Sequence, residues 1–205
     1  MGKIIAIAGN LGAGKTTLAR LICAQAGFTP YLEQPDSRPF QRAFTAGPAR
    51  WAFANQLDFF LLRCQQEQLA RQRDEIAVFD AGLDQDFHVF TRHIHHQGYL
   101  SADEFDLCRR LYTFARAMLP PPDLIIHLQV ALPTLLARRA TRRRETVDQA
   151  FAPQQFGEIE ALLDEWLNGE QASPVLPFSL EKDIQGCASE MDALIEQVSA
   201  MFHPL

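Results

Sequence analysis

The residues from 9 to 16 are Gly9-Asn10-Leu11-Gly12-Ala13-Gly14-Lys15-Thr16. They fit the pattern G-x-x-x-x-G-K-[ST] of a phosphate-binding loop. The apolar run from Ile4 to Ala8 comes before them and predicts a buried strand, and Leu18, Leu21 and Ile22 follow at helical spacing. Because the pattern stands between a strand and a helix, it predicts backbone N–H groups that wrap a phosphate at a helix N-terminus.

Two side chains of this loop carry the predicted chemistry. Lys15 would reach the β- and γ-phosphates of ATP, and the hydroxyl of Thr16 would bind Mg²⁺. The alternative is a glycine-rich turn without a ligand. Agreement of the motif with both flanking elements favours the phosphate loop.

The composition limits the other possibilities. A length of 205 residues predicts one compact domain over residues 1–205, and a net charge of −6 argues against binding to nucleic acid polymers. The cysteines at 23, 64, 108 and 187 lie far apart, which predicts reduced thiols in a cytoplasmic protein. No apolar run approaches the roughly 20 residues of a membrane span.

The pattern of apolar residues predicts strands that alternate with helices. Strands are expected at 4–8, 28–33, 76–79, 124–130 and 174–180, and helices at 17–26, 51–72, 84–96, 101–118, 131–144, 153–167 and 183–202. Residues 36–50 are expected to form a loop with at most short helical turns. The predicted fold is α/β: a P-loop kinase fold with a five-stranded parallel sheet and helices on both faces.

Two carboxylates follow predicted strands. Ligands of open parallel sheets bind beyond the carboxyl ends of the strands, where Lys15, Glu33 and Asp80 should meet. Asp80 suits a metal ion and Glu33 suits the general base of phosphoryl transfer. The alternative for each is a helix cap or a solvated turn.

A basic run lies near the end of the fifth expected helix, at residues 131–144. Its members are Arg138, Arg139, Arg142, Arg143 and Arg144. Because guanidinium groups bind phosphate through paired hydrogen bonds, the run predicts a phosphate-binding lid over about residues 138–150, rather than only a solvated helix end. The histidines at 93, 95 and 96 have no complete ligand set and predict a solvent-facing helix end.

The order of these landmarks resembles the deoxynucleoside kinase family, from Lys3 to about Ser179. Gly9–Thr17 is similar to the family's phosphate loop, and Glu33 with Pro35 is similar to its Glu-Pro element, whose glutamate is the catalytic base. Gln56, Arg63, Asp86 and Phe90 match residues that read or pack on the base, and Arg138, Arg142 and Arg144 match the lid. The resemblance also implies a homodimer.

Three positions depart from the family's pattern. Its Asp-Arg-Ser motif is Asp80-Ala81-Gly82 here, so the arginine is missing. Thr45 stands for the tyrosine that contacts the sugar, and Val147 stands for a lid glutamate. The base pocket is therefore matched more completely than the sugar site.

The sequence thus favours phosphorylation of a nucleoside 5′-hydroxyl by ATP and Mg²⁺, with no membrane and no nucleic acid polymer as partner. Two alternatives stay open: a kinase of another small hydroxyl compound or nucleoside monophosphate, and a nucleotide-binding protein with weak catalysis. A charged Asp86 accepts hydrogen bonds from an exocyclic amine, which predicts a purine or cytosine base, and Arg63 is expected to lie beside it.

Overall fold

The computed structural model describes residues 1–33, 38–141, 151–170, 172–180 and 188–202. The strands are β1 (Lys3–Gly9), β2 (Thr29–Tyr31), β3 (Ile76–Asp80), β4 (Leu124–Gln129) and β5 (Val175–Ser179). They form a five-stranded parallel sheet in the order β2-β3-β1-β4-β5. The predicted α/β fold and parallel sheet are confirmed.

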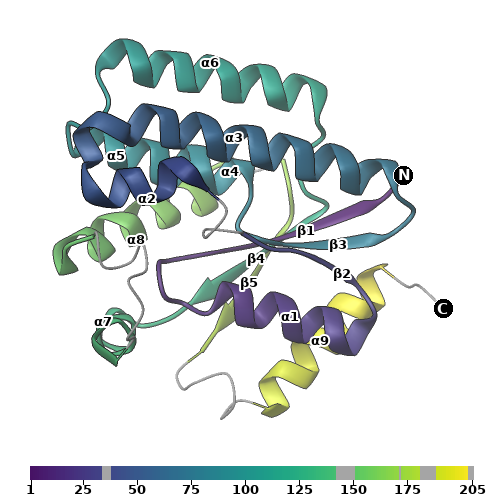
Figure 1. Cartoon of the computed structure of the whole chain (residues 1–205). Coiled ribbons are helices and arrows are strands. Elements are labelled where there is room, and N and C mark those ends of the chain that lie inside the picture. Colours follow the sequence, from purple (N-terminus) through teal and green to yellow (C-terminus); the bar gives the residue numbers. More distant parts are fainter. Residues whose placement is uncertain (34–37, 142–150, 171, 181–187, 203–205) are drawn as a thin grey trace.

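Helices cover both faces of this sheet. They are α1 (Lys15–Ala26), α2 (Pro39–Ala46), α3 (Pro48–Gln72), α4 (Leu83–Gln85), the π-helical turn η2 (Asp86–Thr91), α5 (Arg92–His96), α6 (Ala102–Met118), α7 (Leu132–Thr141), α8 (Pro153–Asn168) and α9 (Ala188–Phe202). Figure 1 shows α1 and α9 together on one side of the sheet, with α3 and α6 on the other. Apolar residues of both layers and of the strands form the main core.

The phosphate loop lies at the switch point of the sheet, where successive strands are added on opposite sides of β1. β1 lies between β3 and β4, and the register pairs Ile7 with Asp80 and Gly9 with Leu128. The chain turns from β1 into α1 at this position, which is the crevice where open α/β sheets bind ligands. Asp80 therefore ends its strand directly beside the start of the loop.

The predicted loop over residues 36–50 is wrong in its described part. Residues 39–46 form α2, and α3 begins at Pro48 rather than near Trp51. Pro39 and Pro48 each occupy the first positions of a helix, where the missing N–H has no helical partner and the fixed φ suits the helix. The prolines that suggested a loop are thus helix starts.

The predicted helix over residues 84–96 is helical but not regular. Its middle, Asp86–Thr91, is a π-helical turn between α4 and α5. Such turns are rare and often lie at functional sites. The turn carries both Asp86 and Phe90, which the sequence singled out as base-reading residues. No helix in the described part of the chain is long and apolar enough to cross a membrane.

Candidate active site

The phosphate loop has backbone conformations that favour glycine. Gly12 and Gly14 have φ values of 73° and 107°, in the left-handed region that side chains disfavour. Gly14 is also the N-cap of α1, so the loop leads directly into a helix N-terminus. A Cβ at Gly9 would lie 2.7 Å from the carbonyl oxygen of Leu128, which explains the first glycine by close packing.

Two cationic side chains lie against this loop. The ammonium of Lys15 donates hydrogen bonds to the carbonyl oxygens of Gly9 and Asn10, at 3.0 Å each. Arg138 of α7 donates to the carbonyl oxygen of Ala13 at 2.8 Å. The structure therefore brings together Lys15 and the first predicted lid arginine. Arg142 and Arg144 lie outside the described residues.

The predicted metal ligands are neighbours. The hydroxyl of Thr16 donates a hydrogen bond to Asp80 Oδ2, and Asp80 is almost completely buried. Mg²⁺ prefers oxygen ligands and commonly uses one or two protein oxygens together with phosphate oxygens. A hydroxyl and a carboxylate beside a phosphate loop fit this requirement.

Glu33 follows β2 at the same end of the sheet and is ion-paired with a buried arginine. Its Oε1 lies 2.5 Å from Nη2 of Arg63. Burial raises the pKa of Glu33 to about 7, against the lowering effect of Arg63, while the negative charges of Asp80 and Asp86 raise it further. A carboxyl group with a pKa near neutrality is well matched to a general base.

Arg63 joins the candidate base to the residues expected to read the nucleobase. Its side chain is 0% exposed, and its Nε donates to Asp86 Oδ2 at 3.0 Å while Nη2 contacts Glu33. Burial alone would lower the pKa of Arg63, but the two carboxylates outweigh this effect and raise it. The predicted position of Arg63 beside Asp86 is confirmed.

Gln56 belongs to the same network through a residue that the sequence did not single out. The hydroxyl of Thr91 lies 2.8 Å from Gln56 Oε1 and 2.7 Å from the backbone oxygen of Asp86. Gln56, Asp86 and Thr91 are all buried. Asp86–Thr91 is a π-helical turn, in which a residue contacts the backbone five positions before it, so an ordinary helical pattern does not suggest the contact between Thr91 and Asp86.

Sequence reasoning also missed Gln85. Its side-chain amide accepts from the N–H of Gly9 at 3.1 Å and donates to the carbonyl oxygen of Gly9 at 2.8 Å. Gln85 is 1% exposed, so both hydrogen bonds form inside the protein. This paired contact ties the segment after β3 to the start of the phosphate loop. Its only sequence signal was its place just after a strand end.

Phe90 and the three histidines have different surroundings from Gln56 and Asp86. Phe90 is partly buried and packs against the main core. His93 is buried and has its ring 5.6 Å from that of Phe151, so its predicted exposure is wrong, whereas His96 is exposed. Burial of His93 follows from packing of α5 against α8, which local sequence does not reveal.

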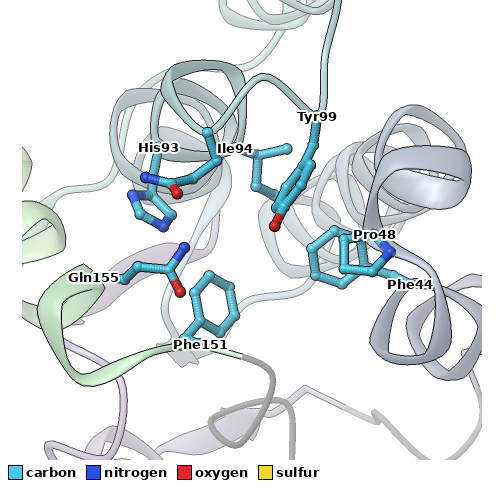
Figure 2. A pocket seen from close by; sticks show the side chains of 8 residues that line it. Phe44, Pro48, His93, Ile94, Tyr99, Phe151 and Gln155 are labelled. Atoms are coloured by element: carbon cyan, nitrogen blue, oxygen red, sulfur yellow. The ribbon is translucent and has the colours of Figure 1, made fainter.

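Figure 2 shows the surroundings of His93. His93, Ile94 and Tyr99 face Phe44, Phe151 and Gln155 across a small cavity. The cavity between them has a volume of about 10 Å³. Such a volume holds about one water molecule and is far too small for a nucleoside. It is therefore a packing gap between α2, α5 and the start of α8 rather than a substrate pocket.

A phosphate loop at the switch point of a parallel sheet, with a hydroxyl and a carboxylate beside it, defines a P-loop phosphotransferase. A sequence model of the deoxynucleoside kinase family matches residues 5–203. The chain therefore belongs to the deoxynucleoside kinase family and is a nucleoside kinase.

Individual proteins agree with this assignment. The chain is 26% identical to the deoxyadenosine/deoxycytidine kinase of Bacillus subtilis, over 98% of this chain and 94% of that protein. It is 29% identical to the deoxyguanosine kinase of the same organism, over 84% of this chain and 82% of that one. The fold matches the structure of deoxyadenosine kinase from M. mycoides with bound dCTP, at a TM-score of 0.81 and 18% identity, over 96% and 99% of the two chains.

The pKa of Glu33 predicts how activity depends on pH. If Glu33 is the base, only its deprotonated form is active, so kcat/KM for the nucleoside should rise as pH increases through about 7. Below that pH it should fall about tenfold per unit, since each unit removes nine-tenths of the active form. Steady-state kinetics at saturating ATP and Mg²⁺ measure this profile.

Glu33→Gln supplies the control. The amide keeps the shape but cannot take a proton, so the remaining activity should be low and should lose the step near pH 7. A wild-type profile that is flat from pH 5 to 8, or a step that persists in Glu33→Gln, would contradict the assignment.

Proposed function

We propose that the enzyme transfers the γ-phosphoryl group of ATP to the 5′-hydroxyl of a deoxynucleoside and releases ADP and the 5′-monophosphate. The observation that supports this most directly is the position of Glu33. It lies at the same end of the sheet as the phosphate loop. Its carboxylate forms an ion pair with Arg63, which forms a second ion pair with Asp86. One charged network thus links the candidate general base, Glu33, with Asp86, the residue expected to bind the nucleobase.

The roles of the individual residues follow from their contacts. Glu33 takes the proton of the 5′-hydroxyl as that oxygen bonds to the γ-phosphorus and the bond to the β-phosphate oxygen breaks. Lys15 and Arg138 lie at the phosphate loop, where positive charge stabilises the transferred group. Thr16 and Asp80 would hold Mg²⁺, which neutralises phosphate charge when bound. Arg142 and Arg144 are proposed to complete the lid.

Ala81 occupies the position of the arginine that the related motif carries. It has a left-handed φ of 62° and is buried, and its methyl group supplies no positive charge. Arg63 instead provides the guanidinium beside Glu33. We propose that Arg63 keeps Glu33 oriented, in place of an arginine at 81. The absence of that arginine also favours a second candidate function, a nucleotide-binding protein with weak catalysis.

The nucleobase of the substrate is proposed to be a purine or cytosine. Asp86 presents a carboxylate held by Arg63, and Gln56 lies in the same buried network. A carboxylate accepts a hydrogen bond from an exocyclic amine and repels a carbonyl oxygen. The relatives named for deoxyadenosine, deoxycytidine and deoxyguanosine support the same choice, since each of these bases has an amine.

A nucleoside panel tests both the activity and the base. With ATP and Mg²⁺ saturating, release of ADP should be fast with deoxyadenosine, deoxyguanosine or deoxycytidine and slow with thymidine, because thymine leaves the buried polar groups unpaired. Coupled measurement of ADP, with detection of the monophosphate, gives kcat/KM for each nucleoside. Lys15→Ala should lower every rate by orders of magnitude, because it removes a charge that acts on the transferred phosphoryl group.

The outcomes separate the alternatives. Thymidine as the best substrate would contradict the base assignment, as would an Arg63→Met/Asp86→Ala variant with unchanged preference. Slow turnover with all four nucleosides, combined with tight ATP binding, would favour the weakly catalytic alternative. Fast phosphorylation of a different hydroxyl compound by the wild type but not by Lys15→Ala would support the kinase activity and contradict the proposed nucleoside substrate.

We also propose that the enzyme is a homodimer that associates through α3 and α6. The large apolar side chains exposed on these helices are Leu61, Leu69, Leu107, Phe114 and Met118. Phe114 and Met118 are one turn apart and are 64% and 68% exposed. Figure 1 shows the two helices side by side at the outer surface. An apolar surface shared by neighbouring helices is typical of a self-association site.

Changing Phe114 and Met118 to aspartate together should convert the dimer to a monomer, because charged groups would be buried at the interface. Light scattering coupled to size-exclusion chromatography measures the mass. Met201→Asp is a matched control, since Met201 is 48% exposed on α9 at the opposite side of the sheet. A monomeric wild type, or equal effects of both changes, would contradict the proposed interface.

A further inference from the structure

A second group of potential metal ligands lies away from the Thr16–Asp80 pair. His127 comes from β4, and Glu160 and Asp164 are one turn apart on α8. One donor atom from each residue lies within 4.8 Å of the others. Because residues four apart on a helix share a face, the two carboxylates point toward the same strand. The sequence pattern does not suggest this group, since its members are far apart in the chain.

The histidine has an unusual lack of partners. His127 is 5% exposed, and its Nε2 is buried without a hydrogen-bond partner among the described residues. The other ring nitrogen, Nδ1, lies 3.5 Å from the side-chain amide of Gln129. Buried polar atoms without partners are rare and need an explanation, such as an ion that is bound in solution.

We propose that His127, Glu160 and Asp164 bind a divalent transition-metal ion, with zinc as the best match. One imidazole and two carboxylates leave a fourth position for water, which suits the tetrahedral preference of zinc. Mg²⁺ is a poorer match, because it prefers oxygen ligands in an octahedral arrangement. With metal–ligand bonds of about 2.0–2.2 Å, neighbouring donors lie roughly 3.5 Å apart, so small side-chain movements would close the site.

The proposed site is connected to the phosphate loop. Asn10 donates from Nδ2 to Glu160 Oε2 at 2.7 Å and to the carbonyl oxygen of Phe156 at 2.9 Å. The Asn10 Oδ1 atom accepts from the N–H of Leu11 at 2.8 Å. Asn10 therefore orients the Glu160 carboxylate, as partners of metal ligands commonly do. A bound ion would attach α8 to the loop through this contact.

Zinc titration of the full-length, tag-free protein tests the proposal. Competition with a chromophoric chelator should give one high-affinity Zn²⁺ per chain at pH 7.5. Both His127→Gln and Asp164→Asn should weaken this binding at least tenfold. Loss of a residue that only hydrogen-bonds to a metal ligand already lowers metal affinity by about tenfold or more, and these variants remove a ligand itself. Substitution with Co²⁺ should give the intense visible absorption of a tetrahedral site, and both variants should lose it.

Matched controls separate this site from other binding. His96→Gln changes an exposed histidine and Glu165→Gln changes an exposed carboxylate of α8, so both should keep wild-type zinc affinity. Because His127 is buried, its variant needs a check of folding by thermal melting, whereas Asp164 is exposed and its variant decides the question alone. Equal zinc affinity in Asp164→Asn and wild type, or no zinc binding by the wild type, would overturn the proposal.

Discussion

The ion pairs of Arg63 are the constraint on which the candidate active site depends. This side chain has no exposed surface, and its charge is balanced by Glu33 and Asp86. Removing one partner of a buried ion pair is strongly destabilising, because the remaining charge is left without compensation. The three residues come from α3, from the segment after β2 and from the π-helical turn. Their charges therefore hold these three parts of the chain in one arrangement.

The parallel sheet places this network next to the phosphate loop. β3 lies between β2 and β1, so Glu33 after β2, Asp80 at the end of β3 and Gly9 at the end of β1 lie on three neighbouring strands at the same edge of the sheet. Gln85 then joins the segment after β3 to Gly9 through two hydrogen bonds. Like charges close together disfavour ionisation, and Asp80 and Asp86 accordingly add to the effect of burial on Glu33. The fold thus produces a carboxyl group suited to accept a proton near neutral pH.

Features that depend on local pattern could be predicted from the sequence, and those that depend on distant contacts could not. The glycine loop and the parallel sheet were predicted correctly from local pattern. The pairing of Arg63 with Asp86 joins two different elements and was predicted for another reason, the cost of burying a carboxylate without a partner. The start of α3 was not, because Pro48 indicates either a loop or a helix start until its neighbours are known. Thr91 and His93 were missed because a π-helical turn and packing by α8 determine their surroundings.

The most direct test of the central claim is the titration of the Glu33 carboxyl itself. Carbon-13 NMR of protein with labelled glutamate, assigned by comparison with Glu33→Gln, measures its pKa without reference to catalysis. The expected value is about 7 in the wild type. It should be higher in Arg63→Met, because that variant loses the positive charge that favours the ionised form. A wild-type value near the ordinary 4.5, or no change on loss of Arg63, would contradict the proposed coupling.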